Sequence, residues 1–133
     1  MSQRHFSTER LKSRRSIGQL FGPDGRSVAA YPLRVLYRRE AGGEMPFGVR
    51  AAFVVPKKRF KSAVRRNLLK RRMLEAYRLN KAVFAGTQER CTTEQLQCHL
   101  LFMYTGKEAM PYAAIERKMR KLLVQLDGIL SQG

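Results

Sequence analysis

The chain has 133 residues, 44% of them hydrophobic, and its 27 Lys and Arg residues against 10 Asp and Glu residues give a formal net charge of +17. This length corresponds to a single domain, residues 1–133, which can bury about two-thirds of the surface of the unfolded chain. No run approaches the roughly 20 apolar residues of a membrane span, and no apolar segment follows the basic N-terminal residues, so we expect a soluble, cytoplasmic protein rather than a membrane or secreted one.

The first part of the chain predicts one helix and three strands. A helical pattern covers residues 8–21 and stops at the Gly-Pro-Asp-Gly segment that follows. Residues 27–39 are rich in aliphatic and aromatic side chains and predict a short and a longer strand, because Pro32 divides them. Residues 41–46 are typical of a hairpin connection. Residues 47–55 are then predicted to form a third strand, antiparallel to the second.

The second part predicts a long helix, a buried strand and a final helix. The central helix begins after Ser62, a residue type that caps helices, and runs to about Val83. Residues 84–97 are polar without a clear period and predict a connection, whereas residues 98–105 are an apolar run typical of a central strand. The last helix opens at Pro111. Its apolar stripe consists of Ile115, Met119, Leu122, Leu123, Leu126 and Leu130.

The predicted element order is therefore α-β-β-β-α-β-α. This order indicates an α+β protein, a single-domain α/β sandwich with a mixed four-stranded sheet and a central basic helix. Nothing in the sequence indicates a second domain.

Residues 57–77, KKRFKSAVRRNLLKRRMLEAY, are the most informative segment. At about 100° per residue, one arc of about 140° on the central helix holds Arg66, Asn67, Lys70, Arg71 and Arg78. The opposite arc holds Val64, Leu68, Leu69, Met73 and Ala76. The helix can therefore bury one face and present the other to phosphates, and the large positive charge favours nucleic acid. An anionic membrane is the alternative partner, but the apolar face is needed for the core.

Catalytic or metal-binding residues do not cluster in the sequence. The two aspartates, Asp24 and Asp127, adjoin glycines, the glutamates are scattered, and no glycine-rich phosphate-binding motif is present. His99 lies in a predicted strand, where a satisfied core histidine is favoured over a general base. Cys91 and Cys98 are too few for zinc and are interpreted as reduced thiols, the first in a loop and the second in a strand. No catalytic residue and no metal ligand is therefore assigned.

The segment AVRRNLLKRRMLEAY, with the lysine pair upstream of it, resembles the signature of the bacterial ribonuclease P protein component. The family pattern reads approximately A-x-x-R-N-x-x-K-R-x-x-R-E. This chain matches it at Ala63, Arg66, Asn67, Lys70, Arg71 and Glu75. The last arginine of the pattern is replaced by Leu74, for which Arg72 or Arg78 is a candidate substitute. The resemblance extends over about residues 10–130.

The resemblance implies a ribosomal S5 domain 2-like fold and a role as the accessory subunit of ribonuclease P, the endonuclease that removes the 5′ leader from precursor tRNA. Its active site would consist of RNA, with Mg²⁺ bound mainly by the RNA and no cofactor held by the protein. The implied partners are the catalytic RNA subunit and precursor tRNA, with no membrane and no obligate protein partner.

The resemblance also implies particular RNA contacts. The residues implied to bind the catalytic RNA are Lys57, Lys58, Arg65, Arg66, Asn67, Lys70 and Arg71. A cleft between the sheet and the first helix is implied for the single-stranded leader, with Phe21, Tyr37 and Arg50 in it. Single strands suit aromatic platforms flanked by positive charge. The alternative interpretation is that Phe21 and Tyr37 are core residues and that Arg50 is a solvated strand residue.

Two other functions remain open from the sequence. A ribosomal or RNA-chaperone-like protein without a role in tRNA processing shares the charge and fold class, but predicts no preference for a leader. A self-sufficient protein nuclease would instead cleave RNA without any RNA subunit.

Overall fold

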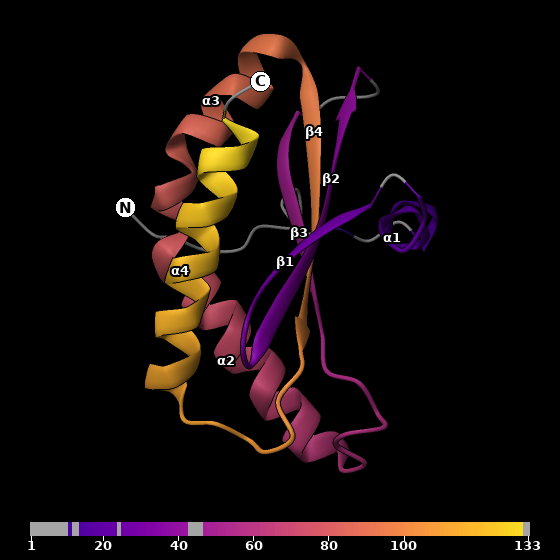
Figure 1. Cartoon of the computed structure of the whole chain (residues 1–133), viewed down its shortest axis with the longest axis vertical. Coiled ribbons are helices and arrows are strands. Elements are labelled where there is room, and N and C mark those ends of the chain that lie inside the picture. Colours follow the sequence, from indigo (N-terminus) through magenta and orange to yellow (C-terminus); the bar gives the residue numbers. More distant parts are fainter. Residues whose placement is uncertain (1–10, 12–13, 24, 43–46, 132–133) are drawn as a thin grey trace.

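One sheet with helices on both faces organises the molecule (Figure 1). The computed structural model describes residues 11, 14–23, 25–42 and 47–131. Among the described residues, three helices cover one face of the sheet: α2 (Ala63–Asn80), α3 (Ala85–Glu94) and α4 (Tyr112–Leu130). The short helix α1 (Arg14–Leu20) covers the other face. The predicted α+β class and the order of its elements are confirmed, and α3 is an addition to them.

The sheet is four-stranded and mixed, with the strand order β1-β2-β4-β3. Its strands are β1 (Arg26–Ala30), β2 (Leu33–Ala41), β3 (Gly48–Val54) and β4 (Leu96–Tyr104). β2 pairs antiparallel with β1 and with β4, whereas β3 pairs parallel with β4. The predicted division at Pro32 is confirmed, because β1 ends before this residue and β2 begins after it.

The predicted hairpin between the second and third strands is wrong. β2 and β3 do run in opposite directions, but β4 lies between them, and Leu101 is opposite both Leu36 and Ala52. The apolar run of β4 explains this order, because a strand that is buried on both faces belongs in the middle of a sheet. Residues 43–46 of the predicted turn lie outside the described residues.

The predicted polar connection over residues 84–97 contains a helix. α2 ends at Asn80 rather than near Val83, and the 3₁₀ turn η2 (Lys81–Phe84) and α3 follow it. In this stretch Phe84, Thr87 and Cys91 are buried, at spacings of three and four residues that place them on one side. Because the buried side of this stretch combines an aromatic, a polar and a sulfur-containing side chain, the sequence shows no clear apolar period there, and the helix is not predicted.

Polar contacts hold α3 in place. Gln88 Oε1 accepts a hydrogen bond of 3.2 Å from the backbone N–H of Val49 at the start of β3. Asp127 Oδ1, from α4, accepts from both the N–H (3.1 Å) and the hydroxyl (2.7 Å) of Thr87. Gly48 has a φ of +134°, and a Cβ there would lie 2.4 Å from Gln88 Nε2. Glycine therefore permits the close approach of β3 to α3.

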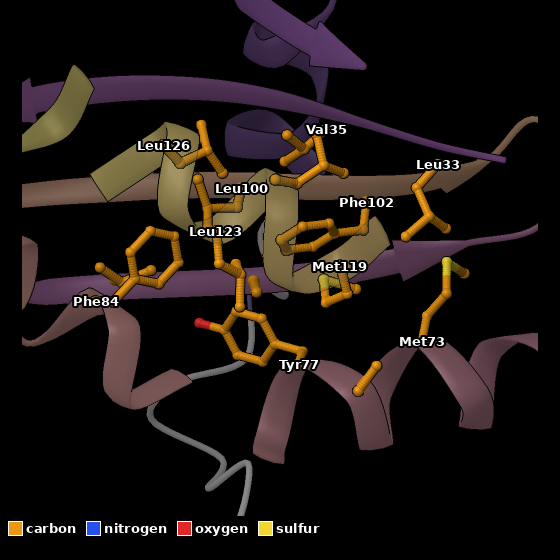
Figure 2. Packing of buried hydrophobic residues seen from close by; sticks show 14 of the residues in the cluster. Leu33, Val35, Met73, Tyr77, Phe84, Leu100, Phe102, Met119, Leu123 and Leu126 are labelled. Carbon is orange, nitrogen blue, oxygen red and sulfur yellow. The ribbon is translucent and has the colours of Figure 1, made fainter. Parts of the chain in front are cut away.

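The main hydrophobic core lies between the sheet and the three-helix layer (Figure 2). Phe102 of β4 is stacked on Phe53 of β3 with 5.3 Å between ring centroids, and Tyr77 of α2 is tilted against Phe102 at 5.5 Å. Aromatic contacts of this kind add to the free energy gained by burial. The predicted apolar stripe of the last helix is confirmed, since all six of its residues are buried.

The buried face of α2 differs in part from the predicted one. Its buried residues are Leu69, Met73, Ala76, Tyr77 and Asn80. In contrast, Val64 is 79% exposed and Leu68 is only half-buried. The reason is the phase of the helix: at about 100° per residue, Val64 and Leu68 both lie more than about 120° from the centre of the arc that holds the buried residues.

A smaller hydrophobic cluster lies on the other face of the sheet. Its buried members are Leu11, Leu20 and Leu101, and α1 packs there against β2 and β4. α1 covers the second half of the helix predicted over residues 8–21, of which residues 8–10 and 12–13 lie outside the described part of the chain. The sheet therefore has a thick helical layer on one face and a thin cover on the other.

Candidate RNA-binding surfaces

The loop before α2 and the first turn of this helix form one unit. Ser62 is the N-cap, as predicted, and its hydroxyl accepts a hydrogen bond of 3.3 Å from the N–H of Arg65. The side chain of Phe60 is buried in the core and anchors the loop. Arg66 Nη1 then donates to the carbonyl oxygens of Phe60 (2.8 Å) and Lys61 (2.9 Å). Arg66 therefore ties the loop to the helix.

Six of the seven residues implied to bind the catalytic RNA are exposed, namely Lys57, Lys58, Arg65, Asn67, Lys70 and Arg71, and Arg66 is half-buried. Asn67, Lys70 and Arg71 lie within an arc of about 100° on α2, and we call these three residues the α2 basic surface. Arg65 lies outside this arc. The two lysines are exposed in the turn that precedes the helix.

The two candidate substitutes for the missing family arginine have partners within the protein. Arg72 Nη1 donates a hydrogen bond of 2.6 Å to the carbonyl oxygen of Met110. Arg78 Nε donates to Glu75 Oε2 at 3.0 Å, and this hydrogen bond lowers the pKa of the Glu75 carboxyl and raises that of Arg78. Leu74 itself is half-buried. Both arginines therefore stabilise α2 and its junction with the segment before α4.

The structure does not bring together the three residues implied for the leader. Tyr37 is half-buried and packs against the main core on the three-helix side. It follows Val35, a core residue, by two positions, and alternate residues of a strand point to the same face. The assignment of Tyr37 to a cleft beside the first helix is therefore wrong, and its interpretation as a core residue is confirmed.

Phe21 and Arg50 lie on the α1 side of the sheet. Phe21 directly follows α1 and is 61% exposed, which contradicts its interpretation as a core residue. Arg50 alternates with Val49 and Ala51, which are in the main core, so it points to the opposite face. Its side chain is half-buried.

A row of three side chains crosses this face from strand to strand. Arg38 of β2 is opposite His99 of β4, and His99 is opposite Arg50 of β3. We call these three residues the cross-strand row. Arg38 Nη1 donates to Oε1 of Gln19 in α1 (3.0 Å) and to Glu40 Oε2 (3.3 Å). Sequence reasoning missed Arg38, because its neighbours follow from the strand register and not from a motif.

His99 is the buried member of the row. It is 2% exposed, its Nε2 lies 3.3 Å from Gln97 Oε1, and its Nδ1 has no hydrogen-bond partner among the described residues. The prediction of a satisfied core histidine is therefore wrong in part. Burial lowers the pKa of His99, the positive charges of Arg50 and Arg38 lower it further, and Glu40 opposes them. The imidazole is consequently neutral near pH 7.

The described part of the chain contains no group of three or more His, Cys, Asp or Glu residues that could hold a metal ion. Within the same residues, no helix has the length and apolar character needed to cross a membrane.

A family model described as Ribonuclease P matches residues 7–127. The chain belongs to the ribonuclease P protein family. Ribonuclease P protein components from two strains of Porphyromonas gingivalis are each 40% identical to it over 123 residues, which cover 91% of this chain and 85% of each relative. As a member of the ribonuclease P protein family, the chain is an accessory component of an endoribonuclease whose catalysis resides in RNA.

Solved structures of ribonuclease P proteins have the same fold. The protein from Thermotoga maritima is 27% identical, with a TM-score of 0.65 over 88% of this chain and 96% of its own. The protein from Staphylococcus aureus is 18% identical, with a TM-score of 0.65 over 92% of this chain and 97% of its own. The second likeness supports the fold alone.

The lowered pKa of His99 makes the free energy of unfolding depend on pH. Since the unfolded chain has the ordinary histidine pKa of 6.5, it binds more protons than the folded chain below about that pH. We expect the free energy of unfolding to fall between about pH 7.5 and pH 5, and His99→Gln to reduce this fall. Urea titrations of both proteins at the two pH values measure it, and an equal fall in both would contradict the assignment.

Proposed function

We propose that this chain acts as the protein subunit of a ribonuclease P particle in tRNA 5′-end maturation. The α2 basic surface binds the catalytic RNA, and the α1 side of the sheet holds the 5′ leader of precursor tRNA. The observation that carries the proposal is the exposure of Asn67, Lys70 and Arg71 on one arc of α2 in a chain of this family. None of the comparisons favours a ribosomal or RNA-chaperone-like role.

The anchoring of α2 supports the first contact. Leu69 and Met73, which are fully buried, flank the two exposed cations in sequence. The backbone that carries Lys70 and Arg71 is therefore fixed before RNA arrives, and only their side-chain rotamers lose freedom on binding. When these cations neutralise phosphates, the counterions bound to the RNA are released, so the affinity of the protein for RNA falls as the salt concentration rises.

The arrangement on the α1 side supports the second contact. Phe21 offers an exposed ring beside α1, and Arg38 and Arg50 supply positive charge on the same face of the sheet. A base can stack on the ring while phosphates of the same strand approach the arginines. The ring and the charges recognise any single strand, so this surface favours a leader without requiring a particular sequence.

The remaining parts of the proposal concern the particle. Mg²⁺ is bound mainly by the RNA, and the protein supplies fixed cations where RNA segments approach one another. The RNA subunit and precursor tRNA are the partners that this role requires. The cytoplasm remains the predicted compartment.

The purified chain should increase cleavage of precursor tRNA by its cognate RNA at low Mg²⁺ concentration, because protein cations replace part of the metal-ion screening between RNA segments. Single-turnover cleavage rates across a Mg²⁺ titration, with and without protein, measure this effect. Equal rates at every Mg²⁺ concentration would reject the subunit role, and cleavage by protein freed of all RNA would favour a protein nuclease.

Replacing both Lys70 and Arg71 by alanine should weaken binding of the catalytic RNA and flatten its salt dependence. Each lost phosphate contact reduces the log–log slope of affinity against salt by roughly 0.7 to 0.9. Filter-binding titrations at several salt concentrations give this slope. Arg117→Ala, at an exposed arginine of α4, is the control for net charge. The double variant removes two charges and the control removes one. If the change in slope per removed charge is the same in both variants, a specific role of the α2 basic surface is excluded.

Phe21→Ala should reduce the preference of the particle for precursor over mature tRNA. A lost base stack costs about 1 to 3 kcal/mol, whereas assembly with the catalytic RNA should be unchanged. Tyr31→Ala is the matched control, because Tyr31 is 60% exposed in the turn after β1. Affinities of the assembled particle for both tRNA forms decide the question, and an unaltered ratio in Phe21→Ala would remove Phe21 from the leader site.

A further inference from the structure

The two cysteines of the chain lie side by side in the core. Cys91 of α3 and Cys98 of β4 are 1% and 0% exposed, their Sγ atoms are 3.1 Å apart, and both are free thiols. The sequence predicts Cys98 in a strand, which is confirmed, but it predicts Cys91 in a loop, which is wrong. One thiol from a helix and one from the strand that follows it are thus held in contact.

The surroundings make the two sulfurs chemically different. The thiol of Cys98 hydrogen-bonds to Cys91, which lowers the pKa of Cys91 against the opposing effect of burial. The positive charges of Arg90 and Arg39 lower it further. The same hydrogen bond and burial raise the pKa of Cys98. These directions favour Cys91 as the sulfur that loses its proton first and acts as the nucleophile, with Cys98 as its hydrogen-bonded partner.

We propose that Cys91 and Cys98 are a redox modification site, at which a hydroperoxide oxidises them to a reversible disulfide that fastens α3 to β4. A disulfide needs the sulfurs to approach to about 2.05 Å, which is a displacement of about 1 Å from their present separation of 3.1 Å. The two sulfurs themselves are therefore already close to bonding distance.

The reaction balances in two steps. The Cys91 thiolate attacks one oxygen of the hydroperoxide, so an S–O bond forms, the O–O bond breaks, and the leaving oxygen departs as water or an alcohol after taking a proton. Cys98 then attacks the sulfenic sulfur of Cys91, an S–S bond forms, the S–O bond breaks, and the hydroxyl leaves as water with the Cys98 proton. The two sulfurs lose two electrons in total and the peroxide gains them. A dithiol reductant reverses the change.

α3 provides the route by which the oxidant reaches the buried pair. The helix has 10 residues, of which only Thr87 and Cys91 are buried, so its local opening exposes little apolar surface and costs less than global unfolding. Cys98 stays in the central strand β4 during such an opening. When α3 returns, the oxidised Cys91 meets the Cys98 thiol again.

A peroxide titration of the reduced full-length chain tests the proposal. Trypsin cleaves after Arg90 and Lys107, so both cysteines fall in one peptide, residues 91–107. We expect this peptide to become resistant to alkylation and lighter by two hydrogen atoms than the reduced peptide, and to regain both alkylation sites after dithiothreitol. Sulfinic or sulfonic products, disulfides between chains, or two alkylatable thiols after the peroxide treatment would each overturn the proposal.

Two variants test the different roles of the sulfurs. Cys98→Ser should leave a sulfenic acid on Cys91 that dimedone captures, whereas Cys91→Ser should give little dimedone adduct at Cys98. Equal capture in both variants would contradict the assigned roles.

Hydrogen exchange of the wild-type chain gives a further test of the proposed disulfide, and its result does not depend on whether the cysteine variants fold. The amides of α3 should exchange more slowly, relative to those of α4, in the oxidised protein than in the reduced protein. Unchanged relative exchange would show that no bond fastens α3 to the sheet.

Discussion

The packing of Tyr77 against Phe102 and Phe53 fixes the rotation of α2, and the RNA-binding assignment depends on that rotation. A helix turns by about 100° per residue, so a different buried face would redirect every side chain on it. With Tyr77 and Met73 directed into the core, Arg71 lies on the opposite side of the helix, whereas Lys70, seven residues before Tyr77, lies at the edge of the buried face and is exposed. The aromatic cluster in the core therefore fixes the direction of Arg71 and places Lys70 at the border between core and solvent.

The central strand β4 separates the two surfaces in the same way. Its alternate residues contribute to both sides of the sheet: Leu100 and Phe102 to the main core, and His99 and Leu101 to the α1 side. On β2 and β3, which pair with β4, odd-numbered residues face the main core and even-numbered residues face the α1 side. This rule separates Tyr37 from Arg38, although the two residues are adjacent.

The helical period and the apolar runs predicted the class, the element order and the exposed cations of α2, because these features depend on residues close in sequence. The strand order depends on which strand can be buried on both faces, and a turn sequence such as residues 41–46 does not reveal that a later strand will be inserted. The cleft assignment of Tyr37 failed because it followed a family position without testing the strand alternation from Val35. α3 was missed because its stability depends on Gln88 and Thr87, whose partners are distant in sequence.

Arginines in this chain have two separable tasks. Arg66, Arg72 and Arg90 each donate to backbone carbonyl oxygens at the ends of helices or in the loops beside them. The guanidinium keeps its charge while it makes such bonds, since its planar fork has donors to spare. These arginines therefore hold the fold together and still add to the positive potential that attracts RNA. A charge count alone cannot distinguish them from Lys70 and Arg71, whose exposed side chains can reach phosphates directly.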